Sequence, residues 1–155
     1  MDFPKYNNYR INSRGFSLVE LMVVIAIMGV LAAIVVPNYS EQIKRGKLTD
    51  AVNELAQLRL AMERAFQNTG TYAGTGTDPC AVSMPTGKYF TFTCTSASSP
   101  PTYTLTAKNI GSQGLGAAES YKYTINEGGV MQTAAYAGST FDTPKSCWWI
   151  HQNDC

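Results

Sequence analysis

The sequence predicts an α+β fold in which one long N-terminal helix packs on an antiparallel sheet of roughly four strands. Three patterns lead to this prediction: an apolar run over residues 16–36, apolar residues spaced three and four apart over residues 48–65, and an alternating pattern after residue 69. The first two are typical of a helix and the third of half-buried strands. A helix and a sheet with one apolar face each are expected to pack as two layers.

The apolar run has the length of a membrane span. It holds the 21 residues 16–36, which at about 1.5 Å per residue cross the roughly 30 Å hydrocarbon core of a bilayer. A secretory signal has a shorter apolar core followed by a cleavage site, whereas this run continues directly into Pro37. Residues 16–37 are therefore expected to form a transmembrane helix.

The residues at the start of this run match a known processing site. The segment Arg14-Gly15-Phe16-Ser17-Leu18-Val19-Glu20 resembles the site at which a dedicated peptidase cuts type IV prepilins and pseudopilins. The resemblance implies cleavage between Gly15 and Phe16, N-methylation of Phe16, and assembly roles for Glu20 and for Pro37, which lies at a helix-loosening position of the family. It divides the chain into a cleaved basic leader (1–15), a transmembrane and assembly helix (16–37), and an amphipathic helix with a disulfide-bonded head (38–155).

Glu20 is a carboxylate inside an apolar segment, and such a group costs a few kcal/mol or more unless it has a partner. A cut at Gly15 creates an amine on Phe16, and this cation is a natural counter-ion for Glu20 in the same chain or in a neighbour. Pairing between chains would set the axial register of an assembly. The alternative is that Glu20 lies near the helix end and reaches the headgroups.

The helical pattern continues after Pro37 as one apolar stripe on a polar cylinder. Asn68-Thr69-Gly70 is expected to end the helix, since Gly supplies a C-cap. The residues of the stripe are Leu48, Val52, Leu55, Leu58, Met62 and Ala65.

The alternating segments after residue 69 predict four strands. Asn126-Glu127-Gly128-Gly129 is a good hairpin turn between the last two. A later apolar segment, 147–150, is expected to add a short strand or to pack on the sheet. The four strand segments are 89–94, 103–107, 121–125 and 130–134.

Four cysteines follow the span: Cys80, Cys94, Cys147 and Cys155. An even number in a small Gly/Ser/Thr-rich domain is best interpreted as two disulfides. That side of the membrane is then oxidising and the leader cytoplasmic. Three connectivities are open, and we favour the local pairing, because each bridge would close a short loop. Zinc is the competing interpretation, but the spacings lack C-x2-C turns. The resemblance places Cys147 to Cys155 in a closed C-terminal loop of the pilin head.

The residues that could carry chemistry do not form a recognisable catalytic motif, so the chain is not expected to be an enzyme or to need a cofactor. The single histidine, His151, has no motif that would make it a base or ligand. Asp142 and Asp154 could contribute to a calcium site, but no series of oxygen ligands accompanies them. No metal site is expected.

Trp148 and Trp149 lie near Lys145, His151 and Gln152, and aromatic side chains beside a cation can hold single-stranded nucleic acid. Against this, one Trp is expected to be buried, and the chain carries a net charge of only +1. Nucleic-acid binding normally requires a broad basic face. DNA is therefore not expected as a partner.

The resemblance implies a structural subunit of a type IV pilus, most similar to a minor pilin. The alternatives are a major pilin, a secretion-system pseudopilin, or a single-span membrane protein with a small binding head. The implied partners are other pilin subunits, the prepilin peptidase, the inner-membrane assembly machinery and the membrane itself. The implied location is the inner membrane before assembly, with the head in the periplasm, and then the extracellular filament.

Overall fold

The computed structural model describes residues 15–111, 113–152 and 155. Residues 1–14 of the predicted leader lie outside the described residues. The chain divides into two compact units, residues 1–39 and 40–155, which share one helix.

Helix α1 runs from Leu18 to Thr69, 52 residues, and is continuous through Pro37. It begins two residues later than the apolar run, because Ser17 acts as its N-cap: Ser17 Oγ accepts a hydrogen bond from the Glu20 N–H at 3.2 Å. It ends where the sequence predicts. Gly70 adopts φ 73° and donates its N–H to Phe66 O at 2.7 Å, which is the left-handed cap that glycine favours.

The strands form one antiparallel sheet of five in the order β1-β2-β3-β4-β5, so every neighbour in space is also the neighbour in sequence. The predicted hairpin turn is present, with Gly129 N–H donating to Asn126 O at 3.0 Å. The strands are β1 Phe90–Ser98, β2 Pro101–Asn109, β3 Lys122–Asn126, β4 Met131–Tyr136 and β5 Ser139–Lys145.

Strand β5 was not predicted, and the segment 147–150, which was expected to form a strand or to pack on the sheet, is not a strand. The physical reason is that β5 is an edge strand whose residues are exposed or half-buried on both faces, so it has no apolar alternation. Residues 147–150 pack instead, with Trp149 buried and Trp148 and Ile150 half-buried.

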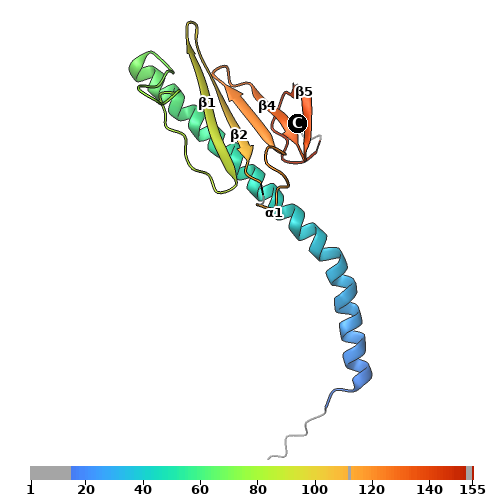
Figure 1. Ribbon diagram of the computed structural model, residues 1–155. Helices are drawn as coiled ribbons and strands as arrows, with labels where there is room; N and C mark the ends of the chain where they lie inside the picture. Colours follow the sequence, from blue (N-terminus) through green and yellow to red (C-terminus); the bar gives the residue numbers. More distant parts are fainter. Residues whose placement is uncertain (1–14, 112, 153–154) are drawn as a thin grey trace, which may run out of the picture. The chain divides into compact units, whose positions relative to one another are not determined.

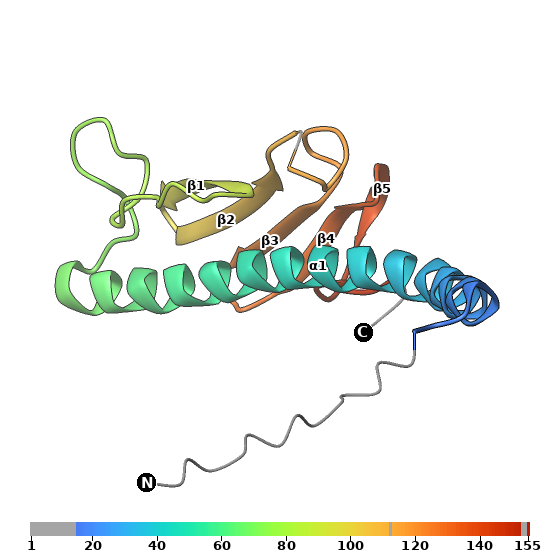
Figure 2. The ribbon, with the colours of Figure 1, turned by 90° about the horizontal axis from the view of Figure 1, so that it is seen from below.

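Within residues 40–155, α1 lies along one face of the sheet (Figures 1 and 2). The predicted stripe forms the helix side of the core, with Leu48, Leu55 and Met62 fully buried. The strands supply the other side by alternation: on β1 the residues Phe90, Phe92 and Cys94 face the helix. The opposite face of the sheet is left to solvent.

Candidate functional site

The residues of the expected processing site lie just outside the helix. Gly15, Phe16 and Ser17 have no regular secondary structure, and Phe16 is 82% exposed. Glu20 stands in the first turn of α1 and is exposed. The Ser-x-x-Glu spacing is that of a capping box, and a carboxylate in the first turn interacts favourably with the helix dipole.

The first half of α1 finds no packing partner within the described part of its own unit. Its side chains from Leu18 to Val36 are exposed, and it is long and apolar enough to cross a membrane by length and composition. Such a surface can be buried only by lipid or by other chains. Pro37 lies within α1.

Two disulfides close the head, Cys80–Cys94 and Cys147–Cys155, with Cα–Cα distances of 6.1 and 5.7 Å. The second closes the C-terminal segment. The first fastens the connection between α1 and β1 onto strand β1, and Ser96 Oγ adds a hydrogen bond to Pro79 O. The resemblance to pilins assigned no role to this first bridge, and the structure supplies one.

The tryptophan pair is not an open stacking surface. Trp149 is 8% exposed, makes edge contacts with Tyr136 and Phe141, and is covered by Lys145 Nζ at 5.8 Å from its ring centre. Trp148 is half-buried, and its Nε1–H donates to Thr124 O at 2.9 Å. His151 and Gln152 are exposed beside the pair.

The acidic residues considered for calcium do not converge in the described part of the chain. Asp142 is exposed on β5, and Asp154 lies outside the described residues. Among residues 15–111, 113–152 and 155, no three His, Cys, Asp or Glu side chains are grouped in a way that could hold a metal ion.

The solvent face of the sheet is a surface of hydroxyl groups. Because threonine alternates with apolar residues on β1 and β2, the two strands present threonines side by side, with Thr93 opposite Thr106 and Thr95 opposite Thr104. Hydroxyls of this kind donate to phosphate oxygens without reading sequence.

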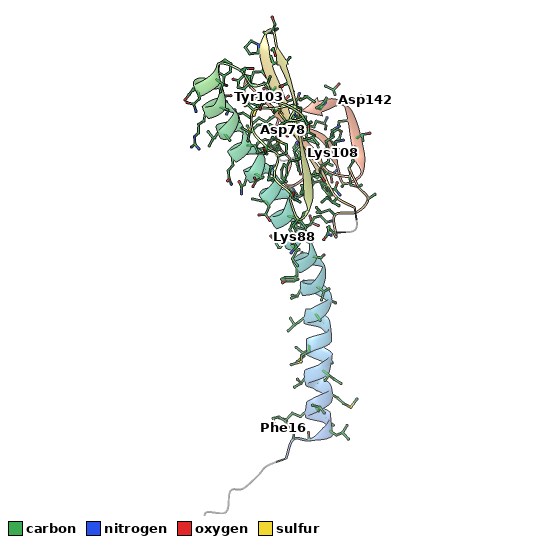
Figure 3. The ribbon with its side chains drawn as sticks, turned by 60° about the vertical axis from the view of Figure 1, so that its left-hand side comes forward. Phe16, Asp78, Lys88, Tyr103, Lys108 and Asp142 are labelled. Carbon is green, nitrogen blue, oxygen red and sulfur yellow. A yellow bond between two sulfur atoms is a disulfide. The ribbon has the colours of Figure 1, made fainter. Side chains whose placement is uncertain are left out.

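Two lysines are paired at one end of this face. The register places Thr91 of β1 beside Lys108 of β2, and Lys108 directly beside Lys122 of β3. Lys88, which stands just before β1, has its Nζ 5.0 Å from the centre of the Tyr89 ring and lines a pocket with Asp50 and Glu54 of α1, so it is not part of this pair. In Figure 3, Lys108 lies below Tyr103 and Lys88 lies below both. We call the pair Lys108 and Lys122 the lysine row.

The lysine row holds two like charges in adjacent positions, which disfavours the strand pair unless an anion is present. Glu119 supplies one negative charge: its Oε1 lies 3.0 Å from Lys108 Nζ. For Lys122 no ion pair is found among the described residues. An anionic ligand such as phosphate would satisfy this arrangement.

Sequence reasoning missed the lysine row. The segment from Cys80 to Cys155 contains four lysines and four acidic residues, so its net charge is zero. The structure separates them: Glu127 accepts a hydrogen bond from the Tyr103 N–H near the other end of β2, and Asp142 lies on β5. The lysines that alternate with apolar residues in 105–108 and 122–125 were the available signal, but only the register brings them together.

Comparisons with known proteins give two family matches. Residues 10–36 match the prokaryotic N-terminal methylation motif. Residues 37–120, more than half of the chain, match the family described as "Type IV minor pilin ComP, DNA uptake sequence receptor". That description goes against the expectation that DNA is not a partner.

Individual relatives are pilins as well. A probable minor fimbrial protein of Dichelobacter nodosus is 41% identical over 66 residues, 43% of this chain and 42% of the relative. A fimbrial protein of Pseudomonas aeruginosa is 48% identical over 53 residues, 34% of each chain. These matches therefore span less than half the length of those relatives.

A longer match joins the chain to the fimbrial protein EcpC of Eikenella corrodens, 29% identical over 137 residues, 86% of this chain and 90% of the relative. A solved type IV pilin from Shewanella oneidensis is 20% identical, with a TM-score of 0.44, and covers 64% of this chain and 99% of its own. The two family matches decide the assignment. The chain belongs to the type IV pilin family as a ComP-type minor pilin, a non-enzymatic structural protein held in the membrane by its apolar helix before it reaches the pilus surface.

Proposed function

We propose that this pilin is cut between Gly15 and Phe16, methylated on Phe16, and built into a filament in which its head binds DNA. The leader would be residues 1–15, the transmembrane and assembly helix 16–37, and the head 38–155. The partners would be other pilin subunits, the prepilin peptidase and the inner-membrane assembly machinery. The head would face the periplasm before assembly and the outside of the cell afterwards.

The observation that carries the DNA-binding proposal is the lysine row. Lys108 and Lys122 are paired across β2 and β3 on a face that α1 leaves open, and both side chains are half-exposed. Lysines of this kind neutralise backbone phosphates, and the neighbouring threonine hydroxyls can add hydrogen bonds. The description of the matched family, a DNA uptake sequence receptor, supports the same ligand.

Double-stranded DNA fits the exposed groups better than single strands do. Single-strand binding depends on aromatic side chains on which bases stack. In the described part of the head, Trp149 is buried, Trp148 is half-buried with its N–H already bonded, and Tyr89 lies between Lys47 and Lys88, each 5.0 Å from its ring centre. Phosphate contacts therefore dominate the proposed interface.

The test measures duplex binding by the full-length processed pilin in nanodiscs of uncharged lipid, between 50 and 200 mM NaCl. Lys108→Gln and Lys122→Gln are each expected to weaken binding about three- to tenfold and to reduce the salt dependence by about one phosphate contact. The control is Arg64→Gln, which removes one exposed charge from α1.

Equal losses in Arg64→Gln and in the lysine variants would mean that net charge, not the lysine row, holds the DNA. No binding by the wild-type protein at 50 mM NaCl would overturn the proposed DNA function altogether.

Processing is tested separately by the intact mass of the protein purified from its own membranes. A chain that starts at methylated Phe16 and carries two disulfides is expected. A chain that still starts at Met1 after exposure to the native peptidase would favour the alternative of a single-span protein with a membrane-anchored binding head.

A further inference from the structure

The connection between β2 and β3, described over residues 110–111 and 113–121, is tied to the sheet at its base. Asn109 is only 2% exposed; its Nδ2 donates to Ala117 O at 2.9 Å and its Oδ1 accepts from the Tyr121 N–H at 2.8 Å. Leu115 inserts into the core with 2% exposure. These contacts fix the position of residues 117–121 relative to the end of β2.

Glu119 has a left-handed backbone in this connection, with φ 60°. Its N–H donates to Asn109 O at 3.1 Å. The same connection uses glycine at two other left-handed positions, Gly114 and Gly116, with φ 74° and 84°. Glycine adopts this conformation without strain, whereas glutamate does not. The strained position therefore carries a side chain where glycine would be easier to accommodate.

That side chain is directed at the lysine row. Glu119 Oε1 lies 3.0 Å from Lys108 Nζ, and the two side chains are 57% and 33% exposed. An ion pair this exposed contributes little to stability and does not offset a left-handed glutamate by itself. The placement of the carboxylate calls for another explanation.

We propose that Glu119 is a built-in competitor of DNA phosphate for Lys108. In the DNA-free pilin, the Glu119 carboxylate forms an ion pair with the Lys108 ammonium group. A phosphate oxygen of DNA must displace this carboxylate before it can bind Lys108. Lys122 stays available throughout. This inference rests on the proposed DNA function and adds a regulatory element to that site: Glu119 lowers the affinity of the lysine row for DNA that makes phosphate contacts alone.

The test compares Glu119→Gln and Glu119→Gly with the wild-type protein, as full-length pilin in uncharged nanodiscs with a random-sequence duplex. Both variants are expected to bind about three- to tenfold more tightly at 50 mM NaCl. The slope of log affinity against log salt should steepen by about 0.9, because one more lysine acts on phosphate. The control is Asp142→Asn, which makes the same charge change on β5 and is expected to leave both quantities near wild type.

A double-mutant cycle with Lys108→Gln identifies the partner of Glu119. If the carboxylate acts through Lys108, Glu119→Gln has no effect on DNA binding in the Lys108→Gln background. A persistent gain in that background would overturn the proposal, because Glu119 would then act only as a general negative charge.

The alternative hypothesis is that Glu119 has only a structural role and relieves the charge repulsion between Lys108 and Lys122. It predicts that Glu119→Gln lowers the melting temperature and leaves DNA affinity and salt slope unchanged, and this result would overturn the competitor role. If the lysine variants weaken binding in that case, the proposed DNA function still stands. If the wild-type protein binds no duplex, the DNA function itself fails.

Discussion

Asn109 shows how one buried polar side chain decides the position of charges on the surface. Its side chain adds to the backbone bonds at the point where β2 ends, since the amide nitrogen and the amide oxygen both bond to the connection that follows. Buried polar groups are tolerated only when they are paired in this way. The placement of Glu119 beside Lys108 therefore depends on a residue that is not itself charged.

Asn109→Ala is expected to lower the free energy of unfolding by about 2–3 kcal/mol, because the Tyr121 N–H and Ala117 O lose their partner. Urea unfolding of the full-length chain in micelles, followed by tryptophan fluorescence, measures this change. Asn53→Ala, on the exposed face of α1, serves as the control and should cost less than about 0.5 kcal/mol. Equal effects in the two variants would contradict the role given to Asn109.

Two buried tyrosines make the head sensitive to alkaline pH. Tyr103 OH donates to Glu63 Oε1 at 3.0 Å, and Tyr123 OH donates to Trp149 O at 2.6 Å. Burial raises the pKa of both above the ordinary value of 10.0, and the hydrogen bond to Glu63 raises the pKa of Tyr103 further. The folded head thus keeps these protons at a pH where the unfolded chain releases them.

The stability that depends on these tyrosines is fully present below pH 10 and falls as the pH rises above it. The loss is expected to be about 1.4 kcal/mol per pH unit for each tyrosine. Tyr103→Phe and Tyr123→Phe should each reduce the loss of stability between pH 10 and 11, measured as the change in the urea concentration at the midpoint of unfolding. Tyr39→Phe, at an exposed position, should leave the slope unchanged; a flattening there would refute the assignment.

At the scale of elements, the helix and the strands that have a buried face follow from the sequence, whereas strand β5 and the register between strands do not. The stripe Leu48 to Met62 has one period and one apolar face, and β1 and β2 alternate without interruption, so burial alone determines both. Strand β5 has no buried face to give it a pattern. The pairing of Lys108 with Lys122 depends on register across a connection of irregular length, which sequence periodicity does not determine.

The two disulfides hold different elements, so the loss of each is expected to expose a different part of the head. Cys80→Ser with Cys94→Ser is expected to cost about 3 kcal/mol, since the bridge closes a loop of roughly 15 residues, and to open residues 70–89 to proteolysis. Limited digestion followed by mass spectrometry locates the cut. Cys147→Ser with Cys155→Ser is the matched control and should leave residues 70–89 protected. Cleavage within residues 70–89 in both double variants would contradict the proposal that the Cys80–Cys94 disulfide specifically holds this connection on β1.

At the scale of the whole molecule, one helix serves two environments. Its apolar stripe from Leu48 to Met62 is buried in the head, whereas the segment from Leu18 to Val36, apolar apart from Glu20, is exposed within its own unit. The second set becomes buried only in lipid or against other subunits. The head therefore has a complete hydrophobic core within one chain, whereas the apolar surface of the N-terminal half of α1 needs lipid or other subunits to bury it.

Glu20→Ala is expected to give a processed protein that stays in the membrane fraction and is absent from sheared filaments, because the Phe16 amine of a neighbour loses its counter-ion. Immunoblots of the two fractions, with the N-terminus determined by mass spectrometry, test this. Asp50→Ala, a carboxylate on the exposed face of α1, should enter filaments normally. Normal assembly of Glu20→Ala would favour the alternative in which Glu20 only reaches the headgroups.

The connection fastened along β1 has a consequence for the protein's behaviour in crowded conditions. Strand β1 ends the sheet, and a bare sheet edge is a template for aggregation with other chains. Here the edge is covered: Thr86 pairs with Thr91, the bridge joins Cys80 to Cys94, and a Cβ on Gly87 would stand 2.3 Å from Phe90 O. Along this edge, pilin heads packed side by side can therefore touch without adding strands to one another's sheets.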